Sequence, residues 1–224
     1  MSLILNIDTA TDQASVSLAQ NGNVLAERLN SKPLDHAAWI HVAVKELMDS
    51  YNKYEIKDLD AVAVVAGPGS YTGIRVGMAT AKGLCYALKL PLICVNTLQV
   101  MAHATNKALS SSLLLCPMLD ARRMEVFTAL YDASLQELVE PCAMILDKDS
   151  FSEWLRNSEI VFFGSGSNKW KDLVQHPNAI FKAFVYSPAS IAAISNDTFI
   201  QQNFSGLAYS EPIYLKDFYS ARKE

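Results

Sequence analysis

The order of strand-like and helix-like segments repeats once along this chain, and this repetition restricts the fold more than any other feature. Continuous or alternating apolar runs predict strands, and apolar residues at three- and four-residue spacing predict helices. In the first half, the order βββαβαβα is predicted at residues 3–8, 14–19, 24–29, 33–51, 61–66, 74–90, 92–95 and from 97. The second half repeats this order at residues 113–119, 125–131, 142–146, 150–156, 160–163, from 168, near 184 and at 189–202. The sequence therefore predicts two similar α/β lobes, each with a mixed sheet and flanking helices.

We place the first lobe at residues 1–102 and the second at 103–224, with the last segment packing back on the first lobe. The chain has 224 residues, of which 50% are hydrophobic and 19% charged, so it can bury a large core. Its net charge of −4 argues against a protein that binds nucleic acid unaided. No segment has the pattern of a signal peptide or a membrane helix. The four cysteines form no C-x-x-C pair, which favours free thiols in a reducing compartment, and we expect a cytoplasmic protein.

A glycine-rich segment between a predicted strand and a predicted helix is a candidate anion-binding or nucleotide-binding loop. Backbone N–H groups at such a turn can bind an anion, and Ser70 or Thr72 could cap the helix. However, Gly67, Gly69 and Gly73 are spaced one residue too widely for the dinucleotide motif, and no Lys-Ser/Thr pair follows as in a P-loop. Glycine and proline also form tight structural turns, so both an anion site and a purely structural turn remain open.

The predicted order of elements resembles the actin, Hsp70 and sugar-kinase superfamily, whose ribonuclease H-like lobes bracket ATP. In that superfamily the hairpin after the first strand binds phosphate, which implies a nucleotide-binding role for Asp8 and Thr9. A turn cap is the alternative for Asp8. One alternative function is therefore an ATP-dependent small-molecule kinase that uses the cleft between the lobes. The sequence weighs against it, because no second acidic residue in a glycine-framed phosphate motif accompanies Asp8.

Four segments carry a closer resemblance, at residues 4–11, 67–77, 79–84 and 119–126. They are similar to the TsaB (YeaZ) family, bacterial relatives of the glycoprotease-like proteins. The resemblance implies a non-catalytic subunit that binds and activates the catalytic subunit TsaD, which threonylcarbamoylates the tRNA adenosine next to the anticodon. It further implies a TsaE-like ATPase as a second partner, a homodimer when the chain is alone, and contact with tRNA that is at most indirect. A glycoprotease-like peptidase is a second alternative function.

The resemblance implies no catalytic residue, no metal site and no required cofactor in this subunit, with ATP and a metal ion on the partner subunits. The histidines support this interpretation independently. TsaD-like sites need two histidines on one face of a helix, whereas His36 and His41 are five residues apart. At about 100° per residue they lie roughly 140° apart around a helix and cannot share one ion.

Two predicted helices of the first lobe are candidates for a partner interface. Small residues at four-residue spacing, including Gly77, Ala81 and Cys85, would let another helix approach closely, but they could equally pack against the protein's own sheet. Trp39 suits an interface anchor or a core position. The resemblance favours pairing, because TsaB-type proteins pair through these helices. The predicted interface comprises His36, Trp39, Ile40, Val44, Ile74, Gly77, Met78, Ala81 and Cys85.

The segment Asp120-Ala121-Arg122-Arg123 is predicted to form a turn between two strands of the second lobe. Its carboxylate and guanidinium groups could form a structural ion pair or face the cleft. We favour the structural interpretation, because paired surface charges are usually solvated.

Overall fold

The computed structural model of the protein describes residues 1–30, 32, 35–109 and 113–216, and it divides the chain into two compact units. The first unit comprises Met1–Ala108 and Val185–Pro212, and the second comprises Leu109–Phe184 and Ile213–Glu224. The expected boundary lay after residue 102, with the last segment packing back on the first lobe. Here the first unit continues for six more residues and takes in Val185–Pro212.

The first unit is built on a five-stranded mixed sheet with the order β3-β2-β1-β4-β5. Its strands are β1 (Leu3–Asp8), β2 (Ala14–Gln20), β3 (Asn23–Asn30), β4 (Ala61–Gly67) and β5 (Leu92–Asn96). β1, β2 and β3 are antiparallel neighbours, whereas β1, β4 and β5 run parallel. Every residue of β1 and β4 is buried, as their largely apolar sequences predict. The predicted Asn21-Gly22 hairpin turn joins β2 to β3, and both residues have positive φ.

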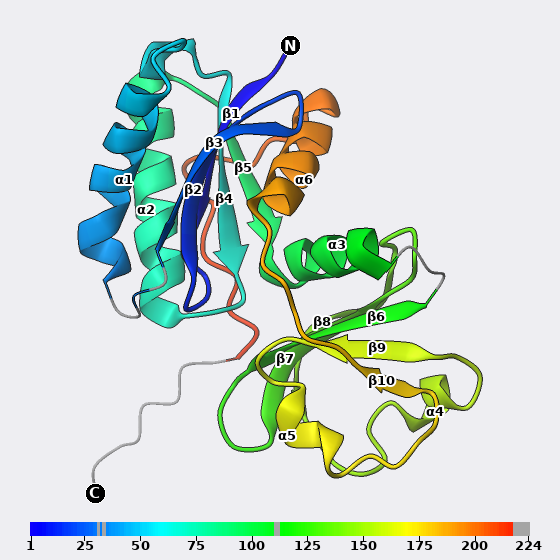
Figure 1. Ribbon diagram of the computed structural model, residues 1–224. Coiled ribbons are helices and arrows are strands. Elements are labelled where there is room, and N and C mark those ends of the chain that lie inside the picture. The colour runs from blue at the N-terminus through cyan, green and yellow to red at the C-terminus, as the bar shows by residue number, and fades with distance from the viewer. Residues whose placement is uncertain (31, 33–34, 110–112, 217–224) are drawn as a thin grey trace, which may run out of the picture. The chain divides into compact units, whose positions relative to one another are not determined.

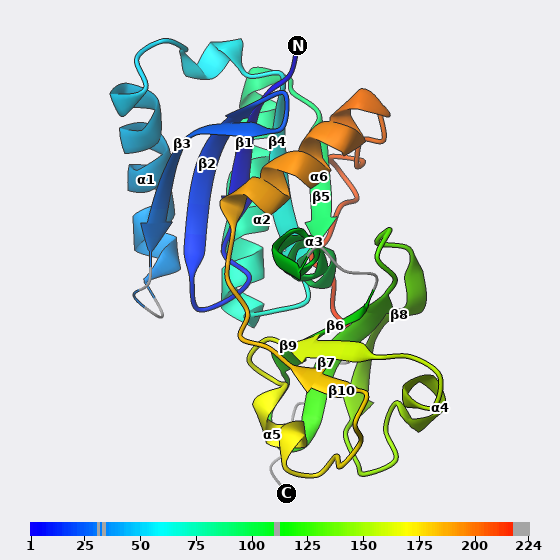
Figure 2. The same ribbon diagram turned by 45° about the vertical axis from the view of Figure 1, so that its right-hand side comes forward.

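Helices cover both faces of this first sheet. α1 (His36–Ser50) and α2 (Tyr71–Leu88) lie on one face, and α6 (Pro188–Ile200) lies on the other (Figures 1 and 2). The unit also contains the short 3₁₀ helix η1 (Ile56–Asp58) and most of α3 (Thr97–Leu109). The helix predicted from residue 33 begins at His36, and residues 33 and 34 lie outside the described residues.

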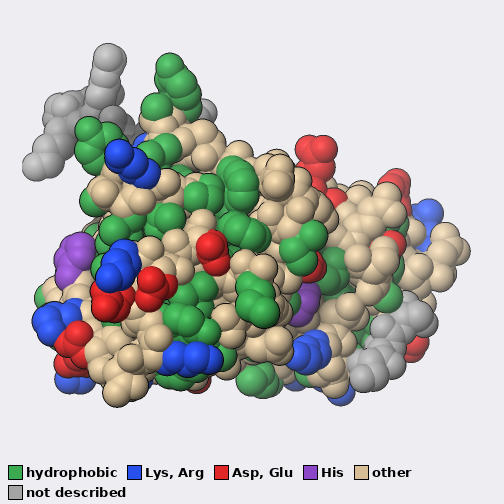
Figure 3. Space-filling model, turned by 90° about the horizontal axis from the view of Figure 1, so that it is seen from above, with side chains coloured by type: hydrophobic (Ala, Val, Ile, Leu, Met, Phe, Trp, Pro, Cys, Tyr) green, Lys and Arg blue, Asp and Glu red, His purple; other side chains and the backbone are tan. Residues whose placement is uncertain are grey.

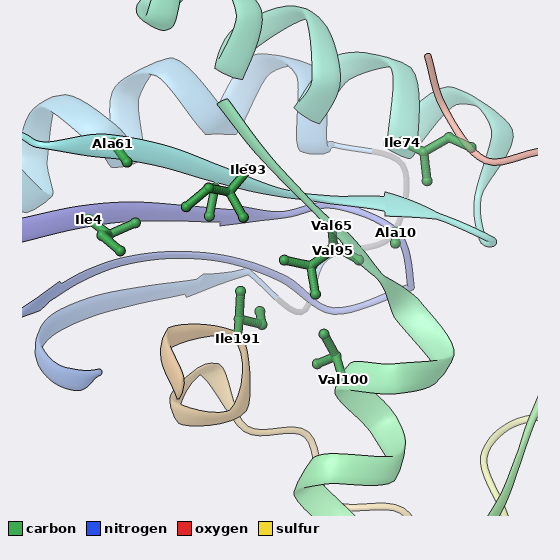
Figure 4. Packing of buried hydrophobic residues seen from close by; sticks show 10 residues of the cluster. Ile4, Ala10, Ala61, Val65, Ile74, Ile93, Val95, Val100 and Ile191 are labelled. Atoms are coloured by element: carbon green, nitrogen blue, oxygen red, sulfur yellow. The ribbon is translucent and has the colours of Figure 1, made fainter. Parts of the chain in front are cut away.

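The repeated order of elements places the last helix in the second lobe, with the last segment packing back on the first, and in the structure α6 packs on the first sheet. Ile191 of α6 points at the sheet and belongs to one buried cluster with Ile4, Val95 and Val100 (Figure 4). A buried hydrogen bond adds to this packing, since the Ser195 hydroxyl donates to Asn6 Oδ1 at 2.6 Å. The helix is apolar around most of its circumference, so its sequence does not show which sheet it covers.

The second unit contains a sheet of the same order, β8-β7-β6-β9-β10. Its strands are β6 (Leu114–Asp120), β7 (Glu125–Tyr131), β8 (Glu137–Ile145), β9 (Ile160–Phe163) and β10 (Ala179–Phe181). The last strand lies a few residues before its predicted position near residue 184. Helices are short here, with α4 (Ser152–Leu155) and α5 (Asn168–Lys171) of four residues each. The core depends on aromatic contacts instead, and the rings of Phe162 and Trp170 meet edge to face at 4.8 Å.

The predicted fold class is confirmed, because each unit is an α/β structure whose mixed five-stranded sheet has the same strand order as the other. Across the part of the chain that the structure describes, we find no helix with the length and apolar character needed to cross a membrane.

Candidate functional site

The glycine-rich loop connects β4 to α2 and rests on the turn that follows β1. The Ser70 N–H donates to the carbonyl oxygen of Ala10 at 2.7 Å, and the Thr9 hydroxyl donates to the carbonyl oxygen of Gly73 at 2.7 Å. These two bonds link segments about 60 residues apart in the sequence. The loop therefore clamps the start of α2 to the end of β1.

Three glycines allow this close approach. A Cβ atom added at Gly69 would lie 2.1 Å from the carbonyl oxygen of Ala10, and one at Gly73 would lie 2.0 Å from that of Thr9. At Gly77 the added atom would lie 2.4 Å from the Thr9 hydroxyl oxygen. No side chain fits at such distances without a shift of the backbone or of Thr9. The spacing of these glycines is thus explained by contact between α2 and the β1–β2 turn.

The same contacts use some of the N–H groups that an anion would need. Ser70 is the N-cap of α2, as predicted, and its hydroxyl accepts from the Gly73 N–H at 3.2 Å. The Ser70 N–H is already donated to Ala10, and the Ile74 N–H donates to the Ser70 carbonyl oxygen. Thr72 lies in the first turn of the helix rather than at the cap. Of the two interpretations of the loop, this geometry favours the structural turn, whereas nucleotide binding stays an untested prediction.

Asp8, at the end of β1, is buried and bonded on both oxygens. Its Oδ1 accepts from the Ala10 N–H at 2.8 Å, and its Oδ2 accepts from the Tyr186 hydroxyl at 2.8 Å. The Tyr186 hydroxyl also lies 2.6 Å from the Ser15 hydroxyl. Burial raises the pKa of the Asp8 carboxyl above its ordinary value, although the bonds from Ala10 and Tyr186 act in the opposite direction. The carboxylate thus joins the start of the returning segment, residues 185–212, to β1 and β2 of the first unit.

His36 and His41 lie in different environments on α1. His36 is buried at the first helical residue, with Nε2 3.0 Å from the carbonyl oxygen of Thr11. His41 is exposed. Within residues 1–30, 32, 35–109 and 113–216, the side chains of His, Cys, Asp and Glu form no group of three or more suited to a metal ion. The two histidines therefore do not form one site here.

The structure corrects the predicted partner interface. Of its nine residues, Trp39 alone is partly exposed, whereas the other eight are buried within the first unit. The four-residue stripe on α2 faces the sheet, since a Cβ at Gly77 would lie 3.4 Å from Val64 of β4 and Cys85 donates to the Pro91 carbonyl oxygen at 3.5 Å. Small side chains there let α2 approach its own sheet. These eight side chains are buried, and of them Val44 alone also lines the groove described next.

The accessible faces of the same helices line a groove of about 1170 Å³. Its α1 side includes His41, Lys45 and Asp49, and its α2 side includes the smaller or apolar residues Val76, Ala79, Gly83 and Leu84. Tyr54, from the segment after α1, and Ile56, from η1, also line the groove. On the face seen in the space-filling view, hydrophobic side chains are intermixed with acidic and basic ones (Figure 3).

Of the predicted interface residues, Val44 alone lines this groove, although the sequence holds a signal for its α2 side. α2 carries apolar or small residues on two faces, one with Ile74 and Ala81 and a second with Val76 and Ala79. One apolar face suffices for packing on the sheet, so the second is available to bind another surface. Sequence reasoning missed Tyr186, and it has no local signal because it contacts Asp8 across 178 residues of sequence.

In the second unit, the Asp120 carboxylate pairs with the side chain of a lysine rather than with the guanidinium groups of the neighbouring arginines. Lys169 Nζ donates to Asp120 Oδ1 at 2.9 Å and to the carbonyl oxygens of Arg123 and Glu125. This bond is the main reason why the pKa of Asp120 lies below its ordinary value. The expected structural role of the carboxylate thus involves Lys169, whereas Arg122 and Arg123 are exposed.

Comparison with known proteins adds to this geometry. The family model described as "TsaD: tRNA N6-adenosine threonylcarbamoyltransferase" matches residues 23–210. The tRNA threonylcarbamoyladenosine biosynthesis protein TsaB of Escherichia coli is 30% identical over 221 residues, which cover 96% of this chain and 94% of that protein. The protein of the same name from Bacillus subtilis is 30% identical over 179 residues, which cover 77% of this chain and 75% of that protein.

Among solved structures, one from Pseudomonas aeruginosa is described as an uncharacterized protein with similarity to peptidase YEAZ. It superposes with a TM-score of 0.85 and 22% identity, and covers 96% of this chain and 100% of that one. At this identity the superposition supports the fold.

Proposed function

This chain belongs to the TsaB family of tRNA threonylcarbamoyladenosine biosynthesis proteins, and we propose that within that pathway it is a non-catalytic subunit that binds and activates a TsaD-like transferase. As a family member it takes part in the threonylcarbamoyladenosine modification of tRNA. The proposal concerns how it does so.

The non-catalytic role is supported by the internal engagement of the polar groups around the glycine-rich loop. Both oxygens of Asp8 accept hydrogen bonds from the protein's own Ala10 and Tyr186. Nε2 of His36 is bonded to a backbone carbonyl oxygen of the β1–β2 turn. Groups that would act as a general base or hold a metal ion in an enzyme instead join the elements of the first unit.

The groove between α1 and α2 is the proposed docking surface for the TsaD-like subunit. It has the mixed character of a protein interface, with apolar Val76 and Leu84 and with Lys45 and Asp49 available for polar contacts. A model of the transferase itself matches most of this chain, so both subunits are expected to contain equivalent helices. Two such helix pairs can pack by a pseudo-twofold arrangement, as two copies of one chain do in an isologous dimer.

This arrangement agrees with the other expected interactions. The chain alone would form a homodimer through the same groove, and the TsaD-like subunit would displace one copy. A TsaE-like ATPase would join the heterodimer, with ATP and a metal ion bound by the partner subunits. We place the complex in the cytoplasm.

Substitution of Gly83 by Arg tests the docking surface without disturbing the core. Gly83 lines the groove, and a Cβ there would meet no atom within 4 Å. An arginine should therefore fit in the free chain but place an unpaired charge in the interface. Such a charge costs about 2–5 kcal/mol, or roughly 30-fold or more in affinity. Gly206→Arg is the matched control, because Gly206 is equally open and does not line the groove.

The measurements are complex formation by size-exclusion chromatography and tRNA threonylcarbamoylation reconstituted with the cognate TsaD-like and TsaE-like subunits, ATP and threonylcarbamoyl-adenylate. Gly83→Arg should lose the complex and the activity, whereas Gly206→Arg should retain both. A Gly83→Arg variant that still binds normally would refute the proposed surface. Full activity without this chain, or turnover of ATP with an acceptor by the chain alone, would refute the proposed role.

A further inference from the structure

The turn between β6 and β7 holds two consecutive arginines in an unfavourable backbone conformation. Arg122 and Arg123 have φ angles of 71° and 49°, in the left-handed region that side chains other than Gly, Asn and Asp rarely adopt. Hydrogen bonds from the Ala121 N–H to the Glu125 carbonyl oxygen and from the Glu125 N–H to the Arg122 carbonyl oxygen close the turn. The Arg122 N–H also donates to Asp120 Oδ1 at 2.6 Å.

The chain itself provides a comparison for this conformation. In the first unit, the turn between β2 and β3 is another turn with two consecutive residues of positive φ, and they are Asn21 and Gly22. These are the residues that adopt the left-handed region at low energetic cost. Arg122 and Arg123 offer no such advantage to the backbone. Their presence is better explained by what their side chains do.

The charges at this turn are not balanced within the described residues. The carboxylate of Asp120 is already paired with Lys169, and that of Glu125 is paired with Lys216. Neither Arg122 nor Arg123 has a side-chain hydrogen bond or ion pair with any residue that the structure describes, and both are exposed. The turn thus presents two consecutive exposed arginines whose charges have no neutralising partner in the described part of the chain.

We propose that Arg122 and Arg123 bind neighbouring phosphates of the tRNA backbone when the complex engages its substrate. The choice of RNA rests on the proposed function, which places this chain in a complex that modifies tRNA. A guanidinium group matches the planar, bidentate geometry of a phosphate better than any other side chain. Contacts of this kind position the RNA and carry no sequence information.

The contact is a supplementary one. The net charge of −4 is unfavourable for RNA binding elsewhere on the chain, so the two arginines contribute locally while the partner subunits supply most of the affinity. The proposal therefore adds a direct contact to the indirect role that the sequence predicts. It also predicts strong dependence on salt, because binding two phosphates releases condensed counterions.

The sharpest test replaces Arg122 by Asn and Arg123 by Gly, the pair that the chain uses at residues 21 and 22. This double variant keeps the backbone conformation at lower cost and removes both charges. Arg156→Gln combined with Lys182→Gln is the matched control, since both residues are exposed in the second unit and the net charge changes by the same amount. Binding of a tRNA transcript is measured by fluorescence anisotropy across salt concentrations, for the full chain alone and for its complex with the TsaD-like and TsaE-like subunits.

The Asn-Gly variant should bind tRNA about 10- to 60-fold more weakly at 0.1 M salt, and the slope of log affinity against log salt should fall by about 1.5–2. The control should change neither value appreciably. Equal effects of the two double variants would overturn the proposal, since net charge alone would then explain them. Unchanged tRNA binding with weaker association of the TsaD-like subunit would also overturn it, in favour of an acidic protein partner. Because tRNA binding is also measured on the chain alone, failure of complex formation would refute the proposed function separately.

Discussion

Replacing Gly73 by Ala should destabilise the first unit, whereas the same replacement at Gly83 in the same helix should stabilise it. At Gly73 the new Cβ would lie 2.0 Å from the backbone carbonyl oxygen of Thr9. A backbone atom cannot rotate away as the end of a side chain can, so α2 or the β1–β2 turn must shift. At Gly83 no atom lies within 4 Å of the new Cβ.

The two effects can be sized from these contacts. Ala in place of Gly within a helix gains about 1 kcal/mol at either position. At Gly73, overpacking costs about 1–3 kcal/mol, and the shift also weakens the hydrogen bond from the Thr9 hydroxyl to the Gly73 carbonyl oxygen, which is worth about 1 kcal/mol. Gly73→Ala should therefore lower the free energy of unfolding by about 1–3 kcal/mol, and Gly83→Ala should raise it by about 1 kcal/mol.

Urea unfolding followed by circular dichroism measures both changes. With a urea dependence of about 2 kcal/mol per molar, the two variants should differ in midpoint by about 1–2 M. Equal midpoints, or a stabilised Gly73→Ala variant, would refute the argument that the loop glycines exist to permit contact with the β1–β2 turn.

Two further substitutions test buried positions of the first unit. The pKa of the Asp8 carboxyl is higher in the folded state than in the unfolded state, so protonation of Asp8 favours folding. The contribution of Asp8 to the free energy of unfolding therefore falls as the pH rises from its pKa in the unfolded state through its pKa in the folded state. Asp8→Asn should remove this fall, which urea midpoints measured between pH 4 and 7 will show. A fall as steep in Asp8→Asn as in the unmodified chain would contradict this account of Asp8. Ala81→Arg and Ile40→Glu should each destabilise the unit by roughly 4 kcal/mol or more, since both sites are fully buried. A folded, monomeric Ala81→Arg variant with a normal thermal transition would show instead that this face of α2 is accessible.

Local signals in the sequence predicted the first unit well. The Asn21-Gly22 turn, the Ser70 cap and the buried strands β1 and β4 depend on short-range chemistry, and all are confirmed. The four-residue stripe on α2 was correctly seen as a surface for close approach. However, the sequence could not distinguish an approaching partner from the protein's own sheet, because Gly77 and Ala81 suit both.

Contacts between distant segments could not be predicted in the same way. The bond from Tyr186 to Asp8 and the packing of α6 on the first sheet both depend on the path of the chain after β10. The sequence of an apolar helix such as α6 does not indicate which sheet the helix packs on. In the second unit, α5 has four residues where the repeat predicted a counterpart of the 18-residue α2, since aromatic packing around Trp170 replaces helix packing there.

The return of residues 185–212 to the first unit has a consequence for synthesis on the ribosome. The five strands of the first sheet have all been translated by Asn96, but α6, which covers one face, begins only at Pro188. Because translation proceeds at about 5–20 residues per second, that face of the sheet stays uncovered for roughly 5 to 20 seconds before α6 is made. During this interval the apolar side chains that later meet Ile191 are open to chaperones or to other nascent chains. The second unit, encoded in between, has the opportunity to fold first.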